Sequence, residues 1–134
     1  MKLKTSVIVA LFMLSMTTLF GQTNSHGDKY VFIISKINYL KAIDDAVLGA
    51  SESKLQIDEV RVILCGESVK AFAEKDPLID KALANKKIVL QACGLSLEQM
   101  KVDKSIIPDN IKIVKNGILE AMVLESKGYK KFDL

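Results

Sequence analysis

The chain has 134 residues, of which 49% are hydrophobic and 26% charged, and its formal net charge is +3. A chain of this length and composition predicts one small domain. The low net charge and the single arginine, Arg61, argue against a protein that binds nucleic acid.

Residues 1–21 have the pattern of a secretory signal peptide. Lys2 and Lys4 precede an apolar stretch, residues 6–20, and small and polar residues follow it. The stretch is shorter than the about 20 apolar residues that a membrane-spanning helix needs, although an uncleaved anchor has similar flanks. Cleavage after Gly21 would leave 17 basic and 16 acidic residues, a net charge of +1. We therefore expect a periplasmic or secreted protein with no stable membrane anchor.

The segment after the signal peptide, residues 22–28, is polar and predicts a flexible lead-in to a domain at residues 29–134. In that domain, continuous apolar runs typical of buried strands alternate with segments whose apolar residues recur at helical spacing. The last two expected strands are more polar than the others. The expected strands are residues 29–35, 59–65, 87–93, 111–115 and 129–134, and the expected helical segments are 38–53, 67–86, 96–100 and 117–127.

Several residues predict where the helices begin and end. Asp76, followed by proline, interrupts the second helical segment and caps its second half. Ser96 and Gln99 have the spacing of a capping box. Asn116 is placed to cap the last helix, and Gly128 is placed to end it.

Alternating strands and helices predict βαβ units, and therefore a parallel sheet with helices on both faces. The first three strands are the most apolar, so we expect them at the centre of the sheet and the fourth and fifth at its edges. The strand order 4-3-2-1-5 satisfies this expectation. The commoner order 2-1-3-4-5 places the second strand at an edge and fits less well.

The last helix is apolar over more than half of its circumference. Two interpretations follow: the helix is deeply packed in a small domain, or it forms an interface between subunits. The residues concerned are Ile118, Leu119, Ala121, Met122, Val123 and Leu124.

Candidate functional residues lie at the carboxyl ends of the expected strands, where parallel sheets collect ligands and chemistry. Ser35, Cys65 and Cys93 end strands, and Asn116 lies just past the fourth. Cys93 has the most favourable setting, because Gly94 permits a tight turn and a helix begins a few residues later. The amide groups of a helix start lower the pKa of a thiol. The alternative is that Cys93 is one of the many buried, inert cysteines.

The sequence excludes several other kinds of site. The only histidine, His26, lies in the lead-in, so neither a hydrolase triad nor a structural zinc site is expected in the domain. Neither a dinucleotide-binding glycine motif nor a phosphate-binding loop is present.

Three segments together resemble the DsrE/DsrF-like sulfur-relay family: "VRVILCGESVKAF", "KIVLQACGLSLEQM" and "IIPDNIKIVKNGILEAMVLESKGYKKF". The similarity extends over about residues 30–133. It implies a three-layer α/β/α sandwich with a five-stranded, mostly parallel sheet in the order 4-3-2-1-5, assembled as a trimer or hexamer. It also implies that Cys93 accepts sulfane sulfur as a persulfide, without metal or organic cofactor, and passes the sulfur from a donor to an acceptor protein.

The chain departs from the family in two respects. Members with established roles work in the cytoplasm, whereas this chain is expected to be exported. Cys65 also ends the second strand, where relatives often have a histidine. In neighbouring strands about 4.8 Å apart, Cys65 and Cys93 would come within disulfide range.

Three functions are therefore compatible with the sequence. The first is an exported sulfur carrier, similar to a sulfurtransferase, that uses Cys93, with Cys65, Gly94, Ser96, Ser35 and Asn116 in support. The second is a non-catalytic oligomeric binding module of the same fold. The third is a thiol–disulfide protein built on Cys65 and Cys93.

Overall fold

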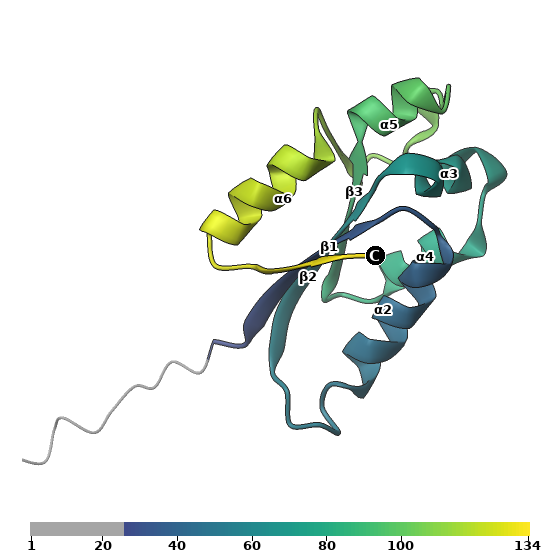
Figure 1. Ribbon diagram of the computed structural model, residues 1–134. Helices are drawn as coiled ribbons and strands as arrows, with labels where there is room; N and C mark the ends of the chain where they lie inside the picture. Colours follow the sequence, from purple (N-terminus) through teal and green to yellow (C-terminus); the bar gives the residue numbers. More distant parts are fainter. Residues whose placement is uncertain (1–25) are drawn as a thin grey trace, which may run out of the picture.

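A computed structural model describes residues 26–134, and the expected signal peptide lies outside the described residues (Figure 1). Five strands form one sheet in the order β4-β3-β2-β1-β5, and every neighbouring pair is parallel. This confirms the predicted strand order. The strands are β1 (Asp28–Ile34), β2 (Ile57–Leu64), β3 (Ile88–Cys93), β4 (Lys112–Val114) and β5 (Lys130–Asp133).

Helices cover both faces of the sheet and make a three-layer α/β/α sandwich, with α6 alone on one face (Figure 1). The larger apolar cluster lies between the sheet face that carries Val62 and Leu90 and the four remaining helices, which cover that face. The smaller cluster joins the face of Ile63 to Ala121 and Leu124 of α6. The helices are α2 (Asn38–Gly49), α3 (Lys70–Glu74), α4 (Pro77–Ala84), α5 (Gly94–Gln99) and α6 (Gly117–Ser126).

The burial of the strands follows their apolar content, as the sequence predicts. Ile63 and Leu64 of β2 are fully buried because β2 has a neighbouring strand on each side and helices on both faces. The edge strand β5 exposes Lys130 and leaves Phe132 47% exposed. Charged side chains on an edge strand hinder the addition of a further strand from another molecule.

The helical segment after β2 is divided in two, as expected. A 3₁₀ turn (Gly66–Val69) leads into α3, which ends where Lys75 adopts a left-handed conformation with φ of 53°. The Asp76 side chain then accepts a hydrogen bond from the Leu78 N–H at 2.9 Å and caps α4.

Two local predictions were wrong. The lead-in does not extend to residue 28: Asp28 already belongs to β1, where its N–H donates to the Gln56 carbonyl at 2.8 Å. The capping box at Ser96 and Gln99 is absent, because α5 begins at Gly94, directly after the extended residue Cys93. Ser96 therefore lies inside the first turn of α5, and its hydroxyl is available for other contacts.

The helix α6 has the predicted ends but exposes much of its apolar surface. Asn116 caps it, accepting hydrogen bonds from the N–H groups of Ile118 and Leu119, and Gly128 ends it with φ of +96°. Only its inner residues are buried, so the first of the two interpretations, a helix deeply packed in the domain, does not hold for the single chain. The exposed apolar side chains are Ile118 (63%), Leu119 (57%), Met122 (57%) and Val123 (39%).

No helix within residues 26–134 is long and apolar enough to cross a membrane.

Candidate functional site

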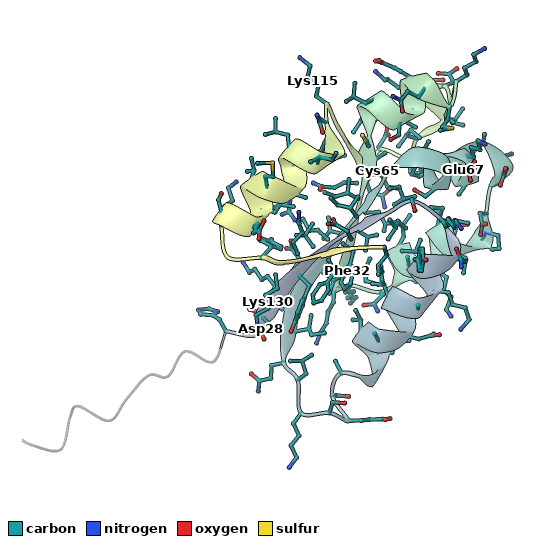
Figure 2. All side chains as sticks on the ribbon, viewed as in Figure 1. Asp28, Phe32, Cys65, Glu67, Lys115 and Lys130 are labelled. Atoms are coloured by element: carbon teal, nitrogen blue, oxygen red, sulfur yellow. The ribbon has the colours of Figure 1, made fainter. Side chains whose placement is uncertain are left out.

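The carboxyl ends of β2 and β3 bring the two cysteines side by side. Leu64 pairs with Ala92 in the parallel register, so Cys65 and Cys93 follow as the next pair of neighbours. Cys65 is held in place by its N–H, which donates to the Ile34 carbonyl of β1 at 2.9 Å. Figure 2 shows Cys65 at the end of the sheet where α5 and the start of α6 lie.

The first residue of α6, Gly117, closes over both cysteines. Its N–H donates to Cys93 Sγ at 3.3 Å. A Cβ atom at this position would lie 2.6 Å from Cys65 Sγ and 3.2 Å from Cys93 Cβ. Only a residue without a side chain lets the backbone approach the sulfur atoms this closely.

Ser96 supplies the second group of hydrogen bonds at the site. Hydrogen bonding from its side chain and its backbone helps to lower the pKa of the Cys93 thiol. The Ser96 Oγ also accepts the Gly66 N–H at 2.8 Å, which leaves the hydroxyl hydrogen free for one of the two cysteine sulfur atoms. The start of the turn after β2 is thereby linked, through Ser96, to the cysteine at the end of β3.

These hydrogen bonds determine the protonation of Cys93. Burial alone would raise the pKa of the thiol, because a buried charge loses its hydration. Hydrogen bonds from the side chain and backbone of Ser96, from the Gly117 N–H and from the Cys65 thiol outweigh burial and lower the pKa below its ordinary value. Such hydrogen bonds stabilise the thiolate, which is the nucleophilic form of cysteine.

Cys65 has the opposite tendency. Burial, the negative charge of Cys93 and the hydrogen bond between the two side chains raise the pKa of the Cys65 thiol to about 12. Cys65 therefore keeps its proton at neutral pH and donates it in a hydrogen bond to Cys93. The pKa values of the two thiols are therefore shifted in opposite directions, and both cysteines are free rather than joined in a disulfide.

The two cysteines also differ in access. Cys93 is only 5% exposed, whereas Cys65 is half-buried. A shallow depression next to Ser35 is lined by apolar residues and by Lys131 and Asp133, and neither cysteine lines it. A molecule that reacts with Cys93 must therefore be small, or must present a narrow group to the site.

The other residues predicted for the site have structural roles. Ser35 is exposed, and its hydroxyl donates to the Leu134 carbonyl at 3.3 Å rather than to either sulfur. Asn116 acts indirectly, because it caps α6 and so fixes the amide of Gly117. At Gly94, a Cβ atom would lie 3.0 Å from the Val114 carbonyl oxygen, so glycine lets β4 pass close to the end of β3.

The sequence predictions missed two residues of the site, Gly66 and Gly117. Gly66 follows Cys65 directly and has φ of +51°, a left-handed conformation that glycine adopts readily. Gly117 follows the capping residue Asn116. The two pairs, "CG" and "NG", were the available signals, but nothing in the sequence indicated that the second lies against the first.

Neither the protein-family models nor the curated proteins contain a match to this chain. The structure is similar to that of MTH1491, a protein of unknown function from Methanobacterium thermoautotrophicum. The TM-score is 0.64 at 14% identity, over 80% of this chain and 99% of the other. It is also similar to BT1422, a conserved protein of unknown function from Bacteroides thetaiotaomicron. Here the TM-score is 0.57 at 23% identity, over 80% of this chain and 95% of the other. At these identities the likeness establishes the α/β fold alone.

Proposed function

We propose that the protein is an exported sulfur carrier that takes up sulfane sulfur as a persulfide on Cys93. The observation that carries the proposal is the position of Cys93 at the end of β3, where the Gly117 N–H donates to its sulfur at 3.3 Å. Hydrogen bonding from Ser96 acts in the same direction, because it too lowers the pKa of the Cys93 thiol. The resemblance of the sequence to the DsrE/DsrF-like family supports the same chemistry. A periplasmic or extracellular location, expected from residues 1–21, is part of the proposal.

The uptake step is a transfer of one sulfur atom between thiols. The Cys93 thiolate attacks the outer sulfur of a donor persulfide, RS–SH, and the S–S bond of the donor breaks. The products are the Cys93 persulfide and the donor thiolate, RS⁻, so no electrons are gained or lost overall. The reverse step, with an acceptor thiolate in place of RS⁻, delivers the sulfur. Because Cys93 is 5% exposed, the donor must present its sulfur on a slender group.

Loading with sulfur tests this proposal directly. We expect the reduced protein, mixed with inorganic polysulfide and quenched within seconds, to gain about 32 Da, the mass of one sulfur atom. Cys93→Ser should gain nothing, and Cys65→Ser should still gain it, because Cys93 keeps its hydrogen bonds from Gly117 and Ser96. Intact-protein mass spectrometry is the measurement. An adduct that persists in Cys93→Ser, or is absent from both the native protein and Cys65→Ser, would contradict the proposal.

We also propose that the chain associates with copies of itself through α6, as a trimer or hexamer if the resemblance holds. The exposed side chains of Ile118, Leu119, Met122 and Val123 form an uncharged face next to the site. Contiguous exposed apolar surface of this kind marks an interaction site. A second copy suits this face because it presents the same uncharged surface. The two surfaces can then pack together without burying a charge that has no partner.

One substitution on α6 tests self-association. Met122→Glu places a charge on the apolar face, where burying it in an interface would be costly. We expect the native protein to sediment as an assembly and Met122→Glu to sediment as a single chain. Lys86→Glu, in the exposed turn before β3, is the matched control and should leave the assembly intact. Stable interfaces bury about 800 Å² per partner. A native protein that sediments as a monomer at about 100 μM would therefore rule out a stable interface on this face of α6.

A further inference from the structure

The position of Cys65 gives the persulfide on Cys93 a second possible fate. Cys65 and Cys93 directly follow Leu64 and Ala92, the last pair in the β2–β3 register, and a Cβ atom at Gly117 would lie within 3.2 Å of atoms of both cysteines. Both lie beneath Gly117, on the same face of the sheet. An external acceptor must reach a cysteine that is 5% exposed, whereas Cys65 lies beside it in the sheet.

The backbone geometry permits a bond between the two sulfur atoms. Neighbouring strands lie about 4.8 Å apart, and disulfides join Cα atoms about 4.4–6.8 Å apart. The Cα spacing of two opposed cysteines at the ends of β2 and β3 therefore falls within the range that a disulfide spans.

We propose that Cys65 resolves the Cys93 persulfide and releases the carried sulfur as hydrosulfide. This inference rests on the proposed function, because it requires that Cys93 first becomes loaded. It adds a second activity to the carrier: when no acceptor takes the sulfur, the protein discharges it as HS⁻ and closes its own site.

The step balances without any further reactant. The Cys65 sulfur attacks the inner sulfur of the persulfide, Cys93 Sγ, and a Cys65–Cys93 bond forms as the bond to the outer sulfur breaks. The proton of Cys65 passes to the outer sulfur, which leaves as HS⁻. The outer sulfur gains the two electrons that the protein loses in forming its disulfide. A dithiol or small-molecule thiol must then reduce the disulfide before the next cycle.

Burial is the largest cause of the raised pKa of Cys65 and persists after loading, so Cys65 must lose its proton as its sulfur attacks. Before loading, Cys65 remains a thiol, because burial and the nearby charge of an ionised Cys93 both raise its pKa. Once sulfur is bound, the negative charge moves outward to the terminal sulfur atom, which can accept the Cys65 proton as it departs. Loading of Cys93 therefore moves one cause of the raised Cys65 pKa, the neighbouring charge, further away and supplies an acceptor for the Cys65 proton.

The test follows the fate of the sulfur after loading. Native protein and Cys65→Ser are loaded briefly with inorganic polysulfide, desalted, and incubated without acceptor. Free hydrosulfide is trapped with a bimane reagent, and intact mass is followed over time. In the native protein we expect the 32 Da gain to give way to a loss of about 2 Da, the two hydrogens of a disulfide, with one equivalent of HS⁻. Cys65→Ser should keep its adduct at least tenfold longer, and Cys65→Ala should behave in the same way.

The possible results separate this inference from the proposed function. If the native protein keeps its adduct as long as Cys65→Ser does, and Cys65 stays free in peptide maps, the resolving role is wrong and the carrier function stands. If neither the native protein nor Cys65→Ser gains the adduct, the carrier function fails and the resolving step fails with it.

Discussion

Gly117→Ala should destabilise the fold by about 2 kcal/mol and reduce sulfur loading of Cys93 at least tenfold. The new methyl group would lie 2.6 Å from Cys65 Sγ and 2.9 Å from Ile63 Cγ2. Neither neighbour can withdraw easily, because Ile63 is fully buried and Cys65 is fixed at the end of a strand. Overpacking of this kind typically costs about 1–3 kcal/mol. The start of α6 must move away, which removes the Gly117 N–H from Cys93.

Urea denaturation and the intact-mass assay measure the two effects of Gly117→Ala. Gly49→Ala is the matched control, because a Cβ atom at Gly49, the last residue of α2, meets nothing within 4 Å. Alanine is also the better helix former by about 1 kcal/mol, so the control should be neutral or slightly stabilising. If the two variants have equal stability and load sulfur equally, Gly117 does not pack closely against the two cysteines.

Leu97→Ala should cost about 3 kcal/mol of stability, within the range of about 2–5 kcal/mol for buried leucines. Leu97 is fully buried and anchors α5, a helix of only six residues, in the larger apolar cluster. Truncation leaves a cavity and loosens the turn that holds Ser96 against Cys93. We therefore also expect the pKa of the Cys93 thiol to rise, since it loses part of its hydrogen bonding.

The control for Leu97→Ala lies in the same helix. Leu95 is 45% exposed, so Leu95→Ala removes little buried surface and should cost less than about 1 kcal/mol. Both variants are compared by urea denaturation. The slope of the unfolding free energy against urea concentration should stay unchanged, so that the shift in midpoint reports stability. Equal losses for the two leucines would mean that α5 is not anchored through Leu97.

The sheet was predictable because its strands differ in polarity. β1, β2 and β3 are the runs with the most apolar residues, and a strand covered on both faces requires such a run. The same reasoning located Cys65 and Cys93 at the carboxyl end of the sheet, because neighbouring parallel strands end on the same side. Adjacent placement of the two cysteines then followed from the strand order alone.

The details of the site were less predictable because they depend on contacts between distant segments. Gly117 donates to a cysteine 24 positions earlier in the chain. Ser96 had the sequence spacing of a helix cap, but the extended backbone of Cys93 starts α5 two residues before it. The contrast between the two thiols likewise depends on which sulfur receives the N–H groups, which composition does not reveal.

The exposed face of α6 illustrates a different limit. Apolar residues on most of a helix surface predict burial, but the sequence does not say whether the chain itself or another copy provides it. The described chain buries only one side of α6, against β1, β2 and β4. The remaining side is where the proposed assembly would form.

The most direct test of the central claim, a stabilised thiolate at Cys93, is its alkylation rate as a function of pH. Peptide mapping of the reduced native protein reports both cysteines in one experiment, so Cys65 serves as the internal reference. The midpoint pH for each cysteine reflects its pKa and does not depend on how slowly the reagent enters. We expect Cys93 to have its midpoint below about 8.5, the ordinary value of a free cysteine, and Cys65 to have a much higher one. A midpoint for Cys93 at or above that of Cys65 would contradict the account and favour a binding module with no sulfur chemistry.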